Sequence, residues 1–269
     1  MTTYISTAPP PMLRGSGPEL LLAHGAGSDI EDSFGPVLEE LAARHTVVGP
    51  DYPGSGKTPL PGRQLTLDEL ADYLVESAVS AGVETFALAG FSMGSAVAVR
   101  AAARHPLRVT ALALSAGFAR PNPRLRMVID TWRALGRRAA ETGSAEDGRT
   151  LASYLSLVVG GTAWLDARTE EETEEQLAAF AAGLPPGMDE QLAVFDHIDV
   201  RPDLARIAVP TLVVSPSGDL ITSPSHSAEL AAGIPGARLV TLDCGHALAA
   251  ERPAEWAAAL TEFLAGARG

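Results

Sequence analysis

The chain has 269 residues, of which 33 are acidic, 20 are basic and 46% are hydrophobic, and its net charge is −13. This length and apolar content allow one large domain with a full core, with or without an insertion. Nucleic acid and anionic membranes are not expected partners, because both bind basic surfaces. The single cysteine, Cys244, excludes an internal disulfide and a metal site built on cysteine pairs, and we expect it to be a small buried filler.

The N-terminal sequence MTTYISTAPPPMLRGSG has no basic region followed by an apolar one, so we expect no signal sequence, and no later run is long enough to span a membrane. A cytoplasmic protein is therefore expected. Residues 1–18 are rich in proline and glycine and can hold at most one or two short edge strands. Glu19–Ala23 is typical of a buried parallel strand, and it ends at a glycine-rich loop with the sequence HGAGS.

A helix is predicted over Phe34–Arg44, with Asp32 or Ser33 as its cap, and a strand over Thr46–Gly49. The next loop, DYPGSGKT, resembles a phosphate-binding loop at its end only. Asp51 stands where that motif needs a glycine, and prolines rather than a helix follow it. We therefore interpret Asp51 as a loop anchor, followed by a helix over 66–81.

Residues 84–104 contain a short apolar run, the pentad GFSMG and an Ala/Val-rich helical segment that ends at Arg104. A serine between two glycines at a strand-to-helix turn is held in a strained conformation, with its hydroxyl exposed at the start of the helix. Ser92 is therefore a candidate nucleophile.

The alternation of strand and helix continues with a strand over 108–114 and then stops, since 119 to about 200 show only helical patterning. Further strands are predicted over 209–215 and 237–242, and further helices over 223–233 and 253–265. This order favours an α/β sheet with a helical insertion. Most apolar residues of the insertion are expected to pack its helices together, and some to face the sheet across a pocket.

Three candidate residues follow predicted parallel strands, namely Ser92, Asp219 and His246. Side chains beyond the carboxyl ends of parallel strands can meet although they are distant in sequence. His246 would remove the serine proton, and Asp219 would orient and stabilise the imidazole. The backbone N–H groups of Ala26 and Met93 would bind the oxyanion. Asp243 is a weaker candidate for the acid, and we expect the other histidines outside the HGAGS loop, His45, His105, His197 and His226, to be surface or structural residues.

On the motifs HGAGS, DYPGSGKT, GFSMGS, SGDLITSP and GHALAAERP, the sequence resembles the α/β-hydrolase superfamily, specifically its lidded esterases and lactonases. The resemblance implies a mostly parallel eight-stranded sheet flanked by helices, with a helical lid inserted after the sixth strand. It divides the chain into a core of residues 1–118 and 201–269 and a lid of residues 119–200. It implies the same catalytic and oxyanion residues, and no cofactor or metal. Substrate-binding candidates are His24, Gly25, Phe118, Trp132, Tyr154 and Trp164, although His24 could only shape its loop.

The expected function is hydrolysis of an ester, lactone or thioester of a small to medium, fairly apolar molecule. Because residue 92 is a serine and not a carboxylate, epoxide hydrolase and dehalogenase chemistry is disfavoured. An enzyme that cleaves C–C bonds, eliminates or cyclises a biosynthetic intermediate is an alternative, and a ligand sensor is a weaker one. A small-molecule substrate and a monomeric or homodimeric protein are expected.

Overall fold

In the computed structural model, which describes residues 8–267, seven strands form one sheet in the order β1-β3-β2-β4-β5-β6-β7. Neighbouring strands are parallel except at one edge, where β1 runs antiparallel to β3. The strands are β1 (Met12–Arg14), β2 (Glu19–Ala23), β3 (Thr46–Gly49), β4 (Phe86–Phe91), β5 (Val109–Ser115), β6 (Thr211–Pro216) and β7 (Arg238–Leu242). The predicted fold class, an α/β sheet of mostly parallel strands, is confirmed.

The number of strands differs from the expectation of eight, because the described residues form seven. Prolines at 9–11 cannot donate to a sheet, so within residues 8–18 only β1 joins the edge. A second edge strand within residues 1–7 would lie outside the described residues. The helical insertion consequently follows the fifth described strand, β5, rather than the sixth.

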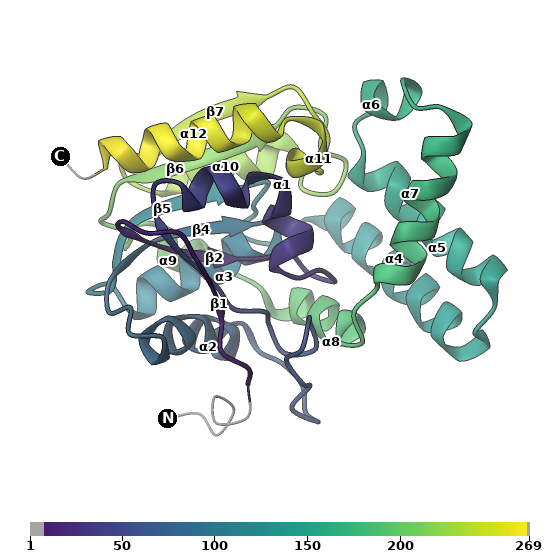
Figure 1. Cartoon of the computed structure of the whole chain (residues 1–269), viewed down its shortest axis with the longest axis horizontal. Helices are drawn as coiled ribbons and strands as arrows, with labels where there is room; N and C mark the ends of the chain where they lie inside the picture. Colours follow the sequence, from purple (N-terminus) through teal and green to yellow (C-terminus); the bar gives the residue numbers. More distant parts are fainter. Residues whose placement is uncertain (1–7, 268–269) are drawn as a thin grey trace.

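Helices cover both faces of the sheet because its strands alternate apolar side chains between two cores. Along β2, Leu20 and Leu22 belong to one buried cluster, whereas Leu21 belongs to the other. The first cluster lies under α1 (Ile30–Ala42), α11 (Leu248–Glu251) and α12 (Pro253–Gly266). The second lies under α2 (Leu67–Ser80), α3 (Met93–Arg104), α9 (Arg201–Leu204) and α10 (Pro224–Gly233). Figure 1 shows α1 and α12 in the upper part of the molecule and α2 and α3 in the lower part.

The start of α1 corrects one sequence prediction. Its N-cap is Asp29, whose side chain accepts a hydrogen bond of 2.8 Å from the backbone N–H of Asp32, the residue expected to be the cap. The helix therefore starts earlier than the apolar periodicity indicated, since Ile30 already lies inside it. Thr66 and Thr169 cap α2 and α7 (Glu170–Gly183) with complete capping boxes.

Between β5 and β6 the chain forms only helices. All of them except α9 are called the inserted helices: α4 (Pro123–Thr142), α5 (Ala145–Val159), α6 (Thr162–Asp166), α7, α8 (Met188–Ala193) and the 3₁₀ helix η1 (Val194–His197). Figure 1 shows α4–α7 beside the sheet, with α8 closer to the core. The two ends of this segment meet, because Val200 N donates to Ala119 O at 2.9 Å. None of the helices in residues 8–267 is long and apolar enough to cross a membrane.

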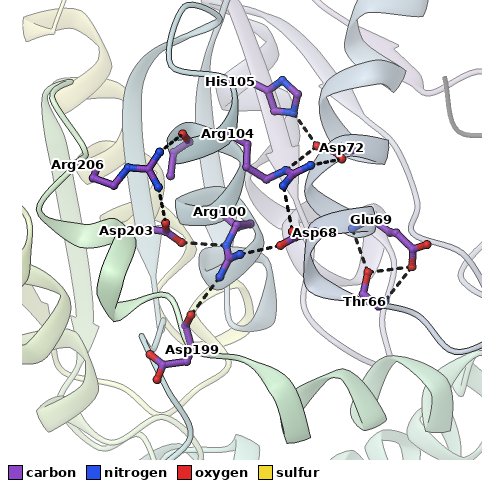
Figure 2. Close-up of polar contacts among 11 residues, drawn as sticks. Thr66, Asp68, Glu69, Asp72, Arg100, Arg104, His105, Asp199, Asp203 and Arg206 are labelled. Carbon is purple, nitrogen blue, oxygen red and sulfur yellow. Dashed lines mark hydrogen bonds and ion pairs between the residues drawn. The ribbon is translucent and has the colours of Figure 1, made fainter.

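An ion-pair cluster joins α2, α3 and α9, which cover the same face of the sheet (Figure 2). Arg100 of α3 lies 2.7 Å from Asp68 of α2 and 2.9 Å from the buried Asp203 of α9. Arg104, one turn later, lies 3.0 Å from Asp68 and 2.6 Å from Asp72. The cluster fixes α3, which begins directly after Ser92, against both α2 and α9.

Candidate active site

Ser92 lies at the sharp turn between β4 and α3, with φ 55° and ψ −123°. Positive φ is strained for a residue with a side chain, so the turn depends on close packing around it. A Cβ atom on Gly90 would lie 2.4 Å from Gly94 O, and one on Gly94 would lie 2.0 Å from Ala23 O. Both glycines of the pentad are therefore required by the backbone, and the serine side chain is held at the N-terminus of α3.

The structure brings Ser92, His246 and Asp219 together. Ser92 Oγ lies 3.0 Å from His246 Nε2, and His246 Nδ1 lies 2.7 Å from Asp219 Oδ2. A carboxylate only accepts hydrogen bonds, so Nδ1–H donates to Asp219 and Nε2 accepts from the serine hydroxyl. All three residues are at most 8% exposed. This arrangement suits the removal of a proton from the hydroxyl.

The carboxylate of Asp219 is fixed by the turn that follows β6. The backbone N–H groups of Ile221 and Thr222 each donate to Oδ1 at 2.8 Å. Thr222 Oγ1 lies 2.8 Å from Oδ2, the oxygen that faces His246. The competing candidate, Asp243, is exposed and accepts from Ser217 Oγ at 3.0 Å. The geometry therefore favours Asp219 as the partner of the histidine.

The glycine-rich loop after β2 lies against the turn between β4 and α3, because a Cβ on Gly25 would be 3.4 Å from Ser92 Cβ. Gly25 N donates to Ser33 Oγ at 3.1 Å, and Gly27 N donates to Gln191 Oε1 at 2.9 Å. Ala26 N, between them, has no protein acceptor within the described part of the chain. Met93 begins α3, and its N–H has no acceptor within that helix. Neither N–H group has a protein acceptor within the described residues, which is a condition for binding an oxyanion.

A cavity of about 380 Å³ opens at Ser92 and His246. Its lining is mainly apolar and aromatic, and six of its larger side chains are Phe91, Trp132, Leu155, Trp164, Phe180 and Ile221. Apart from His246, Asp32 is the one ionisable residue in the described lining, which includes neither lysine nor arginine. The cavity therefore suits an apolar, uncharged molecule.

Of the six predicted substrate-binding residues, Gly25, Trp132 and Trp164 line the cavity, and His24, Phe118 and Tyr154 do not. Phe118 is buried below the cavity and stacks on Phe195, with ring centroids 5.2 Å apart. Tyr154 donates its hydroxyl to Val128 O at 2.9 Å and so joins α5 to α4. Both side chains pack helices, which apolar content alone could not distinguish from contact with a ligand.

His24 shapes its loop. It is fully buried; Nε2 accepts from Tyr52 N at 2.8 Å, and Nδ1 donates to Gly25 O at 2.7 Å. Burial lowers its pKa to about 4, because the charged imidazolium is disfavoured away from water. A neutral His24 with both nitrogens hydrogen-bonded to the backbone connects the glycine-rich loop to the loop after β3.

The remaining candidates lie outside the cavity lining. Asp51 Oδ1 accepts from Ile30 N at 3.0 Å, which is the anchoring role predicted for it. Cys244 is buried, and burial raises the pKa of its thiol to about 12, so it remains protonated. Among residues 8–267, no group of three or more His, Cys, Asp or Glu side chains is placed to hold a metal ion.

Three side chains near the site were not predicted from the sequence. Phe91 occupies the first variable position of the pentad, and its ring lies 5.1 Å from that of His246. Glu251 accepts from Gly161 N and from Gly245 N, both at 2.9 Å. Phe91 and Glu251 lie within the motifs GFSMGS and GHALAAERP, which was an available signal, whereas Gln191 of α8 has no local signal in the sequence.

A serine at the turn after a central parallel strand, followed in the chain by an acid and a histidine at later strand ends, is the arrangement of α/β-hydrolase enzymes. The family model described as alpha/beta hydrolase fold matches residues 18–253. The chain belongs to this family of enzymes.

Two relatives and one solved structure illustrate the similarity. Over 93% of its length the chain is 34% identical to pyrrolizixenacetamide deacetylase from Xenorhabdus hominickii, covering 92% of that protein. It is 30% identical to a putative carbamate hydrolase, RutD, from Azorhizobium caulinodans, with 90% of this chain and 89% of that protein covered. A crystal structure of a hydrolase from Pseudomonas aeruginosa superposes with a TM-score of 0.80 and 29% identity, covering 94% of this chain and 93% of that one.

Proposed function

We propose that the protein is a serine hydrolase that cleaves an acyl bond through a covalent intermediate on Ser92. The observation that carries the proposal is the buried hydrogen-bonded series from Ser92 Oγ through His246 to Asp219, with distances of 3.0 and 2.7 Å. Burial strengthens these interactions, because water does not screen them.

In the proposed reaction, Ser92 Oγ attacks the carbonyl carbon while its proton passes to His246 Nε2. The resulting oxyanion accepts hydrogen bonds from Ala26 N and Met93 N. As the tetrahedral intermediate collapses, the bond to the leaving group breaks, and the leaving group takes the proton from His246. A water molecule then attacks the acyl-enzyme, again with His246 as base, and the acid is released as Ser92 regains its proton.

The substrate that we propose is an ester, lactone or thioester of a small to medium, apolar molecule. A cavity of about 380 Å³ lies at the small end of the usual range for ligand sites. Asp32 and the absence of a basic residue from the described lining disfavour an anionic substrate, since burial of an unpaired charge is costly. A substrate panel in which long or anionic acyl compounds react fastest would contradict this assignment.

We further propose that residues 119–200 act as a lid over the core formed by residues 1–118 and 201–269. The inserted helices supply part of the cavity wall, including Trp132, Leu155, Trp164 and Phe180. Such a wall would limit the access of bulk water to the site, while admitting the one water molecule that hydrolysis needs, and would select the acyl group.

Amide or carbamate hydrolysis is a second candidate, favoured by the similarity to proteins named deacetylase and putative carbamate hydrolase. The same residues would serve, with His246 protonating the departing amine. An ester and an amide that carry the same acyl group distinguish the two candidates, because an esterase would leave the amide intact.

Reaction with a fluorophosphonate tests the proposal. Attack by Ser92 Oγ on phosphorus displaces fluoride, and the hydroxyl proton passes to His246. We expect one adduct on Ser92 by intact mass and peptide mapping, absent in Ser92→Ala and lost in His246→Ala. Ser217→Ala, at an exposed serine, is the matched control and should label normally. A folded protein without an adduct would refute the mechanism and favour the lyase, cyclase or sensor alternatives.

A further inference from the structure

Gln191, on α8, is fully buried and binds two loops of the core with one side-chain amide. Its Oε1 accepts from Gly27 N at 2.9 Å. Its Nε2 lies 3.1 Å from Pro53 O and 2.8 Å from Ser55 Oγ. The orientation of the amide is determined by these partners, because Gly27 N–H can only donate and Pro53 O can only accept.

These contacts restrain the backbone on one side of Ala26. The peptide group between Ala26 and Gly27 is planar, so a hydrogen bond to Gly27 N fixes the orientation of the whole group. On the other side, Ser33 Oγ holds Gly25 N. Ser55 Oγ also donates to Ser28 O at 2.5 Å, which closes a circuit of hydrogen bonds from Gln191 back to the same loop. The Ala26 N–H belongs to the peptide group between Gly25 and Ala26, whose carbonyl oxygen accepts from His24 Nδ1 at 2.7 Å. It therefore lies between two further restrained amides.

The helix that carries Gln191 is itself firmly seated on the core. Gly187 N, just before α8, donates to Gly54 O at 3.0 Å. A Cβ on Gly54 would lie 2.5 Å from Gly187 Cα, so the two backbones are in direct contact. From α4, the ring of Trp132 covers Gly27, where a Cβ would lie 2.9 Å from Cζ2. The loop is therefore clamped by residues of the inserted helices.

We propose that Gln191 is a positioning residue that holds the Ala26 N–H in the orientation needed to bind the oxyanion. The inserted helices then complete the catalytic machinery as well as the cavity wall. The inference rests on the proposed function, since it requires an oxyanion at Ala26. It implies that the reaction reaches its full rate only while α8 is in this position, because withdrawal of Gln191 leaves Gly27 N without its acceptor.

The test compares Gln191→Met with wild type, because methionine keeps the length of the side chain and removes all three hydrogen bonds. Gln191→Asn is a milder second variant, and Gln64→Met, at an exposed glutamine, is the control. The readouts are the second-order rate of fluorophosphonate labelling of Ser92 across pH, and kcat and KM for an ester. The phosphoryl oxygen of the probe stands in for the developing oxyanion.

Loss of one oxyanion donor typically costs about 10²–10³ in rate, and a misplaced donor should cost less. We expect the limiting labelling rate and kcat of Gln191→Met to fall by about 10-fold to 100-fold, with KM within about twofold of wild type. The pH midpoint of labelling should stay unchanged, because His246 and Asp219 are not disturbed.

If wild type and Gln191→Met are labelled at equal rates, the inference is overturned and the proposed function remains intact. A shift in KM and in the pH midpoint, or loss of the fold in both variants, would also overturn it, because the role would then be structural. Absence of labelling in wild type would instead refute the proposed function itself.

Discussion

Glu251→Gln is expected to destabilise the protein strongly, because Glu251 is a buried carboxylate that accepts two backbone hydrogen bonds. Both oxygens are used, one by Gly161 N and one by Gly245 N, each at 2.9 Å. A glutamine offers one oxygen and places its NH₂ group against the other N–H. The space there is closed, since a Cβ on Gly161 would lie 2.5 Å from Glu251 Oε2.

The magnitude follows from the lost acceptor. A hydrogen bond to a charged group contributes about 1.5–3 kcal/mol, and a buried donor without a partner costs about 1–3 kcal/mol more. Removal of the buried charge offsets part of this, because a carboxylate away from water is itself costly. We expect a net loss of about 3 kcal/mol in the free energy of unfolding, or about 5–10 °C in the melting temperature.

The assay is urea unfolding followed by circular dichroism, with thermal unfolding as a second measure. Glu255→Gln, at an exposed position on the next helix, is the matched control and should resemble wild type. Equal unfolding free energies for Glu251→Gln and Glu255→Gln would refute the reasoning, because the hydrogen bond that glutamine cannot accept would then contribute nothing.

Two further predictions concern the cavity and the ion-pair cluster. Phe180→Ala should shift the preference towards substrates with longer acyl chains, since each added methylene contributes about 1–3 kcal/mol in an apolar pocket. Phe263→Ala, on α12, is the control, and a chain-length profile of Phe180→Ala equal to that of this control would contradict the assignment. Burial raises the pKa of Asp72, but hydrogen bonds from Arg104 and His105 outweigh it and hold the pKa below its usual 3.8. The resulting stability is present above the pKa of the unfolded state and is lost as pH falls through the lowered pKa. Asp72→Asn should therefore be less stable than wild type by about 1 kcal/mol at pH 7, with no difference in strong acid. Urea unfolding at several pH values measures this difference, and a difference that does not change with pH would contradict the prediction.

The six parallel strands were predictable because most are apolar runs bounded by turn residues, whereas the bounds of β1 were not predicted. Glu19–Ala23 and Thr46–Gly49 occupy the predicted residues, and the other four parallel strands differ by at most two residues at their ends. The meeting of Ser92, Asp219 and His246 followed from one geometric rule, that the carboxyl ends of parallel strands lie at the same edge of a sheet.

The lining of the cavity was less accessible to sequence reasoning. An aromatic residue on an inserted helix can face a ligand, as Trp132 does, or pack against another helix, as Tyr154 does. The difference depends on how the helices cross, which local patterns do not encode. Gln191 and Gly27 are separated by 164 positions, and no periodicity connects them.

The hydrogen bond between Ala119 O and Val200 N has an evolutionary and engineering consequence. Because the chain leaves and re-enters the core at one point, the whole helical segment can be exchanged for another without moving a strand. Such a graft would bring its own acyl-group selectivity. It would also have to supply an acceptor for Gly27 N and a backbone donor for Glu251. We expect chimaeras that restore those two contacts to retain turnover, and chimaeras that match only the length of the segment to fold but react slowly.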